Sequence, residues 1–234
     1  LAVANATPAL WCLSAHEPAE FAMQENAASA FPGRAWLSFG IHPQEPEMTH
    51  FDFLADLARA RRIQAIGECG FDLFNDGFRR TIDRQKTVWS RQLDLAIETR
   101  LPLIVHCRKA LHLVFADSKR LKCVSAVVFH GWPGSPVEAR SFLDKGVNAY
   151  FSAGKGLMRG DRSLIETVRA LPPSRILTET DAPWMRDRDQ DYTSPSEISA
   201  VAARAAEIAG LPEPDFIATV EKNFRTVFGA CPGS

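Results

Sequence analysis

The stretch IQAIGE (63–68) carries a pattern that recurs along the whole chain: a short apolar run ends abruptly on a side chain that can bind a metal or move a proton. Four further runs end in the same way: LSFGIH (37–42), LPLIVH (101–106), SAVVFH (125–130) and RILTETD (175–181). Each run has the length of a buried strand and precedes a segment with helical periodicity. Parallel strands with polar residues at their carboxyl ends direct them into one shared site. Three histidines and two carboxylates gathered there are the donors of a divalent-metal hydrolase.

Strands and helices alternate along the chain, which predicts a parallel sheet. Seven segments are predicted as strands: 1–7, 35–42, 63–68, 102–106, 126–130, 148–153 and 175–181. A doubly wound sheet usually has a Gly-rich phosphate turn after its first strand, and this sequence has none. Functional residues on five strand ends fit the mouth of a TIM (β/α)8-type barrel better. We therefore expect one α/β barrel domain over residues 1–234, with seven strands, one fewer than a closed barrel needs.

The composition limits the classes of partner. A net charge of −1 gives no basic footprint, so extended non-specific binding to duplex DNA is not expected. A metal pair could still attract a phosphate locally. No apolar stretch approaches twenty residues, so no membrane contact is predicted, and no feature indicates an obligate protein partner. Five cysteines without CxxC spacing predict reduced structural thiols in a cytoplasmic protein, with Cys69 and Cys107 on the strand faces opposite Glu68 and His106.

The candidate metal ligands are Glu68, His106, His130 and Asp181. Glu68 has two oxygens and could bridge two ions, although a Glu can also cap a turn or pair with an Arg. His106 and His130 end consecutive apolar strands, which favours paired ligands over two separate core histidines. Asp181 could be both a ligand and the general base for an attacking water, and its alternative role is a turn cap before Ala-Pro.

Other candidate residues stand near these ligands in the sequence. Glu179 precedes Asp181 by two residues, so strand alternation places it on the same face, where it would orient a ligand or water or form a core ion pair. Arg108 could offer a bidentate fork to a phosphate oxygen. Trp132 and Trp184 could stack on a base or simply pack. Three histidines are interpreted as ordinary surface residues: His16, His50 and His112.

Several motifs together resemble a known family. They are GIHP (40–43), IGECGFD (66–72), PLIVHCRKA (102–110), FHGWPGS (129–135), LTETDAPW (177–184) and NFRTVFG (223–229). In this order they resemble the signatures of the TatD family of metal-dependent deoxyribonucleases, which are amidohydrolase-type TIM barrels. The resemblance implies a phosphodiesterase, often a 3′→5′ exonuclease on DNA, with two Mg²⁺ or Mn²⁺ ions, or Zn²⁺ as a third candidate. It implies metal ligands at Glu68, His106, His130 and Asp181, and a contact of His42 with the scissile phosphate.

The chain departs from the family pattern in one respect. Family members begin with a strand that carries His-x-His, a motif absent from this sequence, and the first predicted strand here is similar to the family's second. We expect that the natural protein has a further N-terminal strand; without it the barrel would have an open seam. The alternative is a degenerate, catalytically weak member that binds at most one ion. Because a fold does not fix a substrate, a hydrolase of small esters, lactones or amides also remains open.

Overall fold

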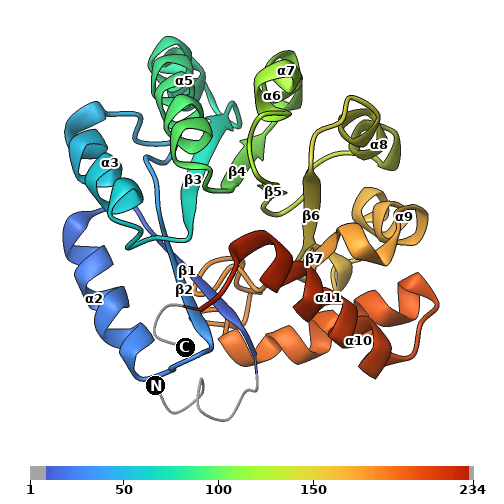
Figure 1. Cartoon of the computed structure of the whole chain (residues 1–234). Coiled ribbons are helices and arrows are strands. Elements are labelled where there is room, and N and C mark those ends of the chain that lie inside the picture. Colours follow the sequence, from blue (N-terminus) through green and yellow to red (C-terminus); the bar gives the residue numbers. More distant parts are fainter. Residues whose placement is uncertain (1–8, 232–234) are drawn as a thin grey trace.

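Within residues 9–231 the sheet contains seven strands in chain order, and all neighbouring pairs are parallel. The computed structural model describes residues 9–231. The strands are β1 Trp11–Ala15, β2 Ala35–Phe39, β3 Ala65–Asp72, β4 Leu103–Arg108, β5 Val127–Phe129, β6 Ala149–Ala153 and β7 Ile176–Thr178. Within the described residues β1 pairs only with β2, and β7 only with β6. The sheet is therefore a curled, half-closed barrel (Figure 1), and the predicted TIM-type α/β class is confirmed.

Most helices surround the curled sheet on its outer side, and the last helix lies against its inner side (Figure 1). They are α2 Pro18–Ser29, α3 Phe51–Arg59, α4 Asp76–Arg80, α5 Ile82–Thr99, α6 Leu111–Ala116, α7 Ser118–Leu121, α8 Pro136–Asp144, α9 Arg162–Ala170, α10 Ile198–Ala209 and α11 Glu213–Phe228. Short 3-10 helices lie at η1 Met48–His50, η2 Lys155–Leu157, η3 Pro173–Arg175 and η4 Pro195–Glu197. No helix within residues 9–231 is long and apolar enough to cross a membrane.

Strand alternation divides the apolar side chains into two cores. The larger core lies between the strands and the surrounding helices, and it includes Cys69 and Cys107, as the sequence predicted. The smaller core fills the inside of the curled sheet around Trp36 and receives Phe228 from the end of α11. The indole N–H of Trp36 donates to the carbonyl of Gly229 at 3.2 Å. The last helix thus packs against the side chains that the strands direct inward.

Several predicted strand boundaries were wrong. The strands predicted over 35–42 and 175–181 end three residues earlier, at Phe39 and Thr178. The segment 11–15 is the first described strand, β1, although its mixed Trp, Cys and Ser side chains give no regular alternation. The predicted strand 1–7 lies outside the described residues. The strand predicted over 63–68 ends too early, because β3 continues to Asp72, and α4 follows it. These differences matter for the site, because His16 directly follows β1 and Asp72 ends β3.

The polar loop after β7 is held in place by a buried cation. Lys155 is only 3 % exposed, and its Nζ lies 2.8 Å from Glu197 Oε2 and 2.9 Å from Asp187 Oδ2. The same nitrogen lies 2.9 Å from the Gln190 side-chain oxygen. A buried charge needs such compensation to be tolerated. These contacts fix the loop 183–197 beside the carboxyl end of the sheet.

The inner core gives a direct test of the fold. We expect Trp36→Ala to lower the free energy of unfolding by about 3–5 kcal/mol, because it empties a fully buried site and removes the link to Gly229. The matched control is Trp184→Ala, since that side chain is 71 % exposed and its loss should change stability by about 0.5 kcal/mol or less. Urea unfolding measures both values. Equal losses for the two variants would contradict this arrangement of the core.

Candidate metal centre

The carboxyl ends of the strands bring the five run-ending residues together. Glu68 lies within β3 and His106 within β4, while His130 directly follows β5. His42 and Asp181 each stand three residues beyond the last residue of β2 and β7, respectively. The first and last of these residues, His42 and Asp181, are more than 130 residues apart in the sequence, and the parallel arrangement of the strands brings them together.

The donor atoms form two groups that share Glu68. In the first group Glu68 Oε2 lies 3.9 Å from His42 Nε2 and 3.8 Å from His106 Nδ1. In the second group it lies 3.7 Å from His130 Nε2, which is 3.6 Å from Asp181 Oδ1. These separations are too long for hydrogen bonds. They match the spacing of roughly 3.4 Å between two donors that each lie about 2.1 Å from a tetrahedral ion.

A bulge in β3 turns Glu68 toward the inside of the sheet. Ile66 and Cys69 both face the outer core, and the register with β4 shifts between them, so one extra residue is accommodated. Gly67 and Gly70 allow this close approach. A Cβ on Gly67 would lie 2.6 Å from Ile104, and one on Gly70 would lie 2.1 Å from the carbonyl oxygen of the β4 residue opposite it. Only glycine fits at these two positions.

Asp72 is a site residue that the sequence interpretation missed. It is fully buried, and its Oδ2 lies 3.1 Å from His106 Nε2 and accepts a hydrogen bond from Gln44 Nε2 at 2.8 Å. If His106 donates through Nε2, its Nδ1 is left with a lone pair directed toward Glu68. The available signal was the spacing, because positions 68, 70 and 72 share one face of a strand, but the predicted strand ends at residue 68.

Glu179 contacts the second histidine in the same way. Its Oε2 lies 3.0 Å from His130 Nδ1, and its Oε1 accepts the backbone N–H of Gly131 at 2.8 Å. Donation from Nδ1 leaves His130 Nε2 as the lone-pair donor toward Glu68 and Asp181. The structure therefore gives both histidines a carboxylate on the ring nitrogen that faces away from the shared Glu68.

Burial and the neighbouring charges shift the pKa values of the residues at this site. Burial would raise the pKa of Glu68, but the neighbouring histidines, His130 above all, outweigh it and hold the pKa well below its ordinary value. Burial would lower the pKa of His130, but the Glu179 carboxylate raises it well above the usual range. Burial, with further carboxylates nearby, raises the pKa of Asp181 to about 6. Burial, together with His106, lowers the pKa of His42 to about 3.

The charge of the cluster fits a pair of divalent cations. Four carboxylates with little exposure to solvent lie around the shared oxygen: Glu68, Asp72, Glu179 and Asp181. Buried carboxylates require compensation by cations or by protons. Neutral histidine nitrogens and carboxylate oxygens are also the donors that divalent transition metals prefer. The four negative charges of these carboxylates thus match two divalent ions, and the donor atoms are of the kinds that such ions bind.

One further candidate, His16, lies elsewhere than the sequence indicated, whereas Trp132 takes one of its two expected roles. His16, interpreted as a surface residue, is partly buried beside His42, with ring centroids 5.1 Å apart, because it directly follows the missed strand β1. Trp132 is buried against Phe129, so it packs and offers no stacking face. Arg108 is exposed and lies 3.9 Å from Asp72 Oδ2, and Trp184, three residues after Asp181 in the chain, is also exposed.

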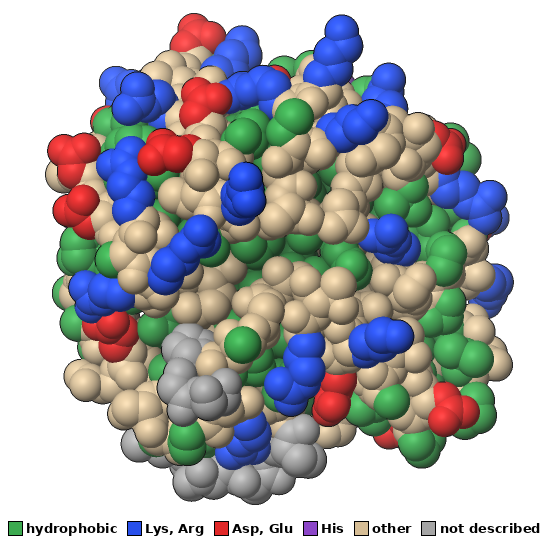
Figure 2. Space-filling model, viewed as in Figure 1, with side chains coloured by type: hydrophobic (Ala, Val, Ile, Leu, Met, Phe, Trp, Pro, Cys, Tyr) green, Lys and Arg blue, Asp and Glu red, His purple; other side chains and the backbone are tan. Residues whose placement is uncertain are grey.

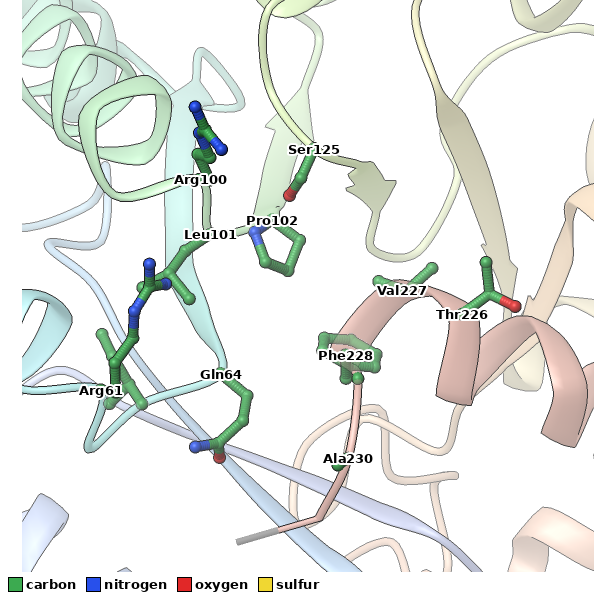
Figure 3. A pocket seen from close by; sticks show the side chains of 12 residues that line it. Arg61, Gln64, Arg100, Leu101, Pro102, Ser125, Thr226, Val227, Phe228 and Ala230 are labelled. Atoms are coloured by element: carbon green, nitrogen blue, oxygen red, sulfur yellow. The ribbon is translucent and has the colours of Figure 1, made fainter.

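A depression at the opposite end of the sheet has a different character. It has a volume of about 440 Å³ and is lined by Arg61, Gln64, Arg100 and Phe228, among others (Figure 3). Gln64 precedes β3 directly, so this depression lies at the amino ends of the strands. It contains none of the candidate ligands. Figure 2 shows basic and acidic side chains interspersed over one face, without a continuous basic surface there.

The role of Asp72 can be tested by metal binding. We expect Asp72→Asn to weaken Mn²⁺ binding by about 10–100-fold, because His106 loses the charged partner that fixes its ring. Isothermal titration calorimetry measures this affinity. Asp76→Asn is the matched control, since Asp76 lies in the same segment, is 80 % exposed and should leave the affinity unchanged. An unchanged affinity of Asp72→Asn would remove Asp72 from the site.

Comparisons with known proteins identify the family of this chain. The family model described as TatD related DNase matches residues 4–229. The 3'-5' ssDNA/RNA exonuclease TatD of Klebsiella pneumoniae (strain 342) is 32 % identical over 217 residues, which cover 88 % of this chain and 81 % of that protein. The same-named protein of Erwinia amylovora is 31 % identical, with 83 % and 78 % covered.

Solved structures give the same result. The crystal structure of YJJV, a TATD homolog from Escherichia coli K12, superposes with a TM-score of 0.83 at 26 % identity and covers 94 % of this chain and 86 % of that one. An amidohydrolase of Saccharomyces cerevisiae, at 16 % identity and a TM-score of 0.71, shares the fold, with 93 % and 88 % covered. With its half-closed barrel and its His-and-carboxylate centre, this chain belongs to the TatD-related DNase family, whose members are metal-dependent hydrolases.

Proposed function

We propose that this protein is a two-metal phosphodiesterase that removes nucleotides from the 3′ end of single-stranded DNA or RNA. The observation that carries the proposal is the sharing of Glu68 by two three-donor groups. A bridging carboxylate is the usual feature of centres that clamp both the attacking and the leaving oxygen of a phosphodiester. The names of the relatives support the substrate and the direction of cleavage.

Each donor group would hold one ion. His42, Glu68 and His106 form the first site, and Glu68, His130 and Asp181 form the second. This differs from the sequence expectation for His42, which assigned it to the scissile phosphate. Three imidazoles beside two carboxylates favour Mn²⁺ over Mg²⁺, because Mg²⁺ prefers oxygen ligands only, and they keep Zn²⁺ as a candidate.

The chain's own residues would position the ions and move the proton. Divalent ions held there would neutralise the phosphate charge and lower the pKa of the attacking water. Asp181 is the most exposed of the three donors in its group, so its free oxygen can accept the proton of that water. Asp72 and Glu179 hold the two histidine rings so that neither rotates away from Glu68.

Residues at the rim would bind the substrate. The Arg108 guanidinium lies 3.9 Å from Asp72 Oδ2 and is exposed, so its remaining N–H groups can contact a phosphate oxygen. Trp184 is exposed on the loop fixed by Lys155 and can stack on a base. A reducing compartment such as the cytoplasm suits the chain, because the structure has no disulfide within residues 9–231.

Hydrolysis of a labelled oligonucleotide tests the proposal. A single strand labelled at its 5′ end should be shortened stepwise from the 3′ end with Mn²⁺, and EDTA should stop the reaction reversibly. Glu68→Gln should lower the rate by at least about 100-fold while the fold persists, because it removes the charge shared by both groups. Glu98→Gln is the matched control, because Glu98 is exposed on α5.

The products distinguish the remaining alternatives. Short 5′-labelled fragments that appear before any stepwise shortening would indicate an endonuclease. Turnover of small esters or lactones in place of oligonucleotides would contradict the nuclease assignment and leave a hydrolase of another substrate class. Full activity of Glu68→Gln would contradict the two-metal centre itself.

A further inference from the structure

An aromatic ring and two cations meet at the rim of the barrel, outside the donor groups. Phe74 follows β3 and is 46 % exposed. The guanidinium carbon of Arg108 lies over its ring, 4.0 Å from the centroid, and Lys109 Nζ lies 4.8 Å from the same centroid. Arg108 ends β4 and Lys109 follows it directly, so two neighbouring strands supply this platform.

One carboxylate ties the platform to the candidate metal centre. Asp72 Oδ1 accepts the backbone N–H of Phe74 at 2.8 Å, while Oδ2 lies 3.1 Å from His106 Nε2. Arg108 Nη1 also lies 3.9 Å from that Oδ2. A single fully buried side chain therefore fixes the aromatic residue and orients a proposed ligand. The platform lies one side chain away from the donors.

Folding alone does not account for these three residues. Phe74 belongs to neither apolar core, so its ring gains little from burial. Two like charges at consecutive positions repel each other over one ring. Lys109 also holds a left-handed backbone conformation, with φ of 56°, which is unfavourable for a residue with a long side chain. Such strain is often found at ligand sites. An anion between the two cations would relieve the repulsion.

We propose that Phe74, Arg108 and Lys109 form a subsite for one nucleotide of a single-stranded nucleic acid, next to the phosphate that is cleaved. Phe74 stacks on the base, and Arg108 and Lys109 contact its phosphate. Every base has a π face, so this contact gives affinity without strong sequence preference. The inference deepens the proposed nuclease function and rests on it for the identity of the ligand.

Binding measurements with Phe74 variants test the subsite. A fluorescein-labelled oligothymidylate is titrated with protein in Ca²⁺, and fluorescence anisotropy gives Kd. Phe74→Ala should raise Kd by about tenfold, the loss typical of one stacked base. Phe74→Tyr keeps the aromatic face and should restore Kd to within about twofold of the unmodified protein. Met23→Ala, which removes an exposed apolar side chain on α2, is the matched control and should leave Kd unchanged.

Oligonucleotides with one abasic position separate stacking from a general loss of structure. The abasic position is moved through the last four nucleotides of the 3′ end. At one of these positions the unmodified protein and Phe74→Ala should bind with equal Kd, because the base that Phe74 would stack on is absent. Thermal melting of Phe74→Ala should match that of the unmodified protein, since the ring packs in neither core.

The outcomes separate the subsite from the nuclease function. A Kd for Phe74→Ala within twofold of the unmodified protein overturns the subsite, as does a loss that is the same at every abasic position. Hydrolysis of the same oligonucleotide with Mn²⁺ is measured in parallel. If the unmodified protein fails to hydrolyse it while the Phe74 effect on Kd persists, the nuclease function fails and the subsite stands.

Discussion

Four carboxylates are packed around a few histidines at one end of this barrel, and their mutual repulsion is the constraint that organises the site. Glu68 lies within 4 Å of three imidazoles, and the carboxylates of Asp72 and Glu179 approach two of those rings from behind. In the absence of cations, protons must compensate. Despite burial, the Glu179 carboxylate raises the pKa of His130, and burial, with the nearby carboxylates, raises the pKa of Asp181 to about 6. Two divalent ions would compensate the carboxylate charges in place of protons, and the donor spacing around Glu68 suits them.

The backbone of β3 around Glu68 has the shape that lets this carboxylate lie among the three histidines. The bulge between Ile66 and Cys69 adds one residue to β3, so the carboxylate faces inward although both neighbours of the bulge face outward. Gly67 and Gly70 let β3 approach β4 more closely than any side chain would permit. The inner core around Trp36 then supports the strands from below, and the Lys155 contacts hold the rim loop.

The sequence was informative where one local signal determined the outcome. His106 and His130 end apolar runs, and parallel strands make such residues converge, so their meeting could be predicted. Glu68 was predicted as a ligand because it seemed to end a strand. It lies inside β3, and its inward direction depends on a bulge that sequence periodicity does not reveal. Asp72 and His16 were missed because each depends on a strand boundary. The direction of an acidic or histidine side chain can be predicted only when the residue is known to lie in a strand or directly after one.

Anomalous diffraction from crystals grown with Mn²⁺ would show whether the carboxylate cluster holds an ion pair. Two peaks about 3.5–4 Å apart are expected, with Glu68 between them. One of the ions should contact His42 and His106, and the other should contact His130 and Asp181. A single peak, or ions that leave the Glu68 carboxylate without a metal contact, would contradict the sharing of Glu68 by two ions.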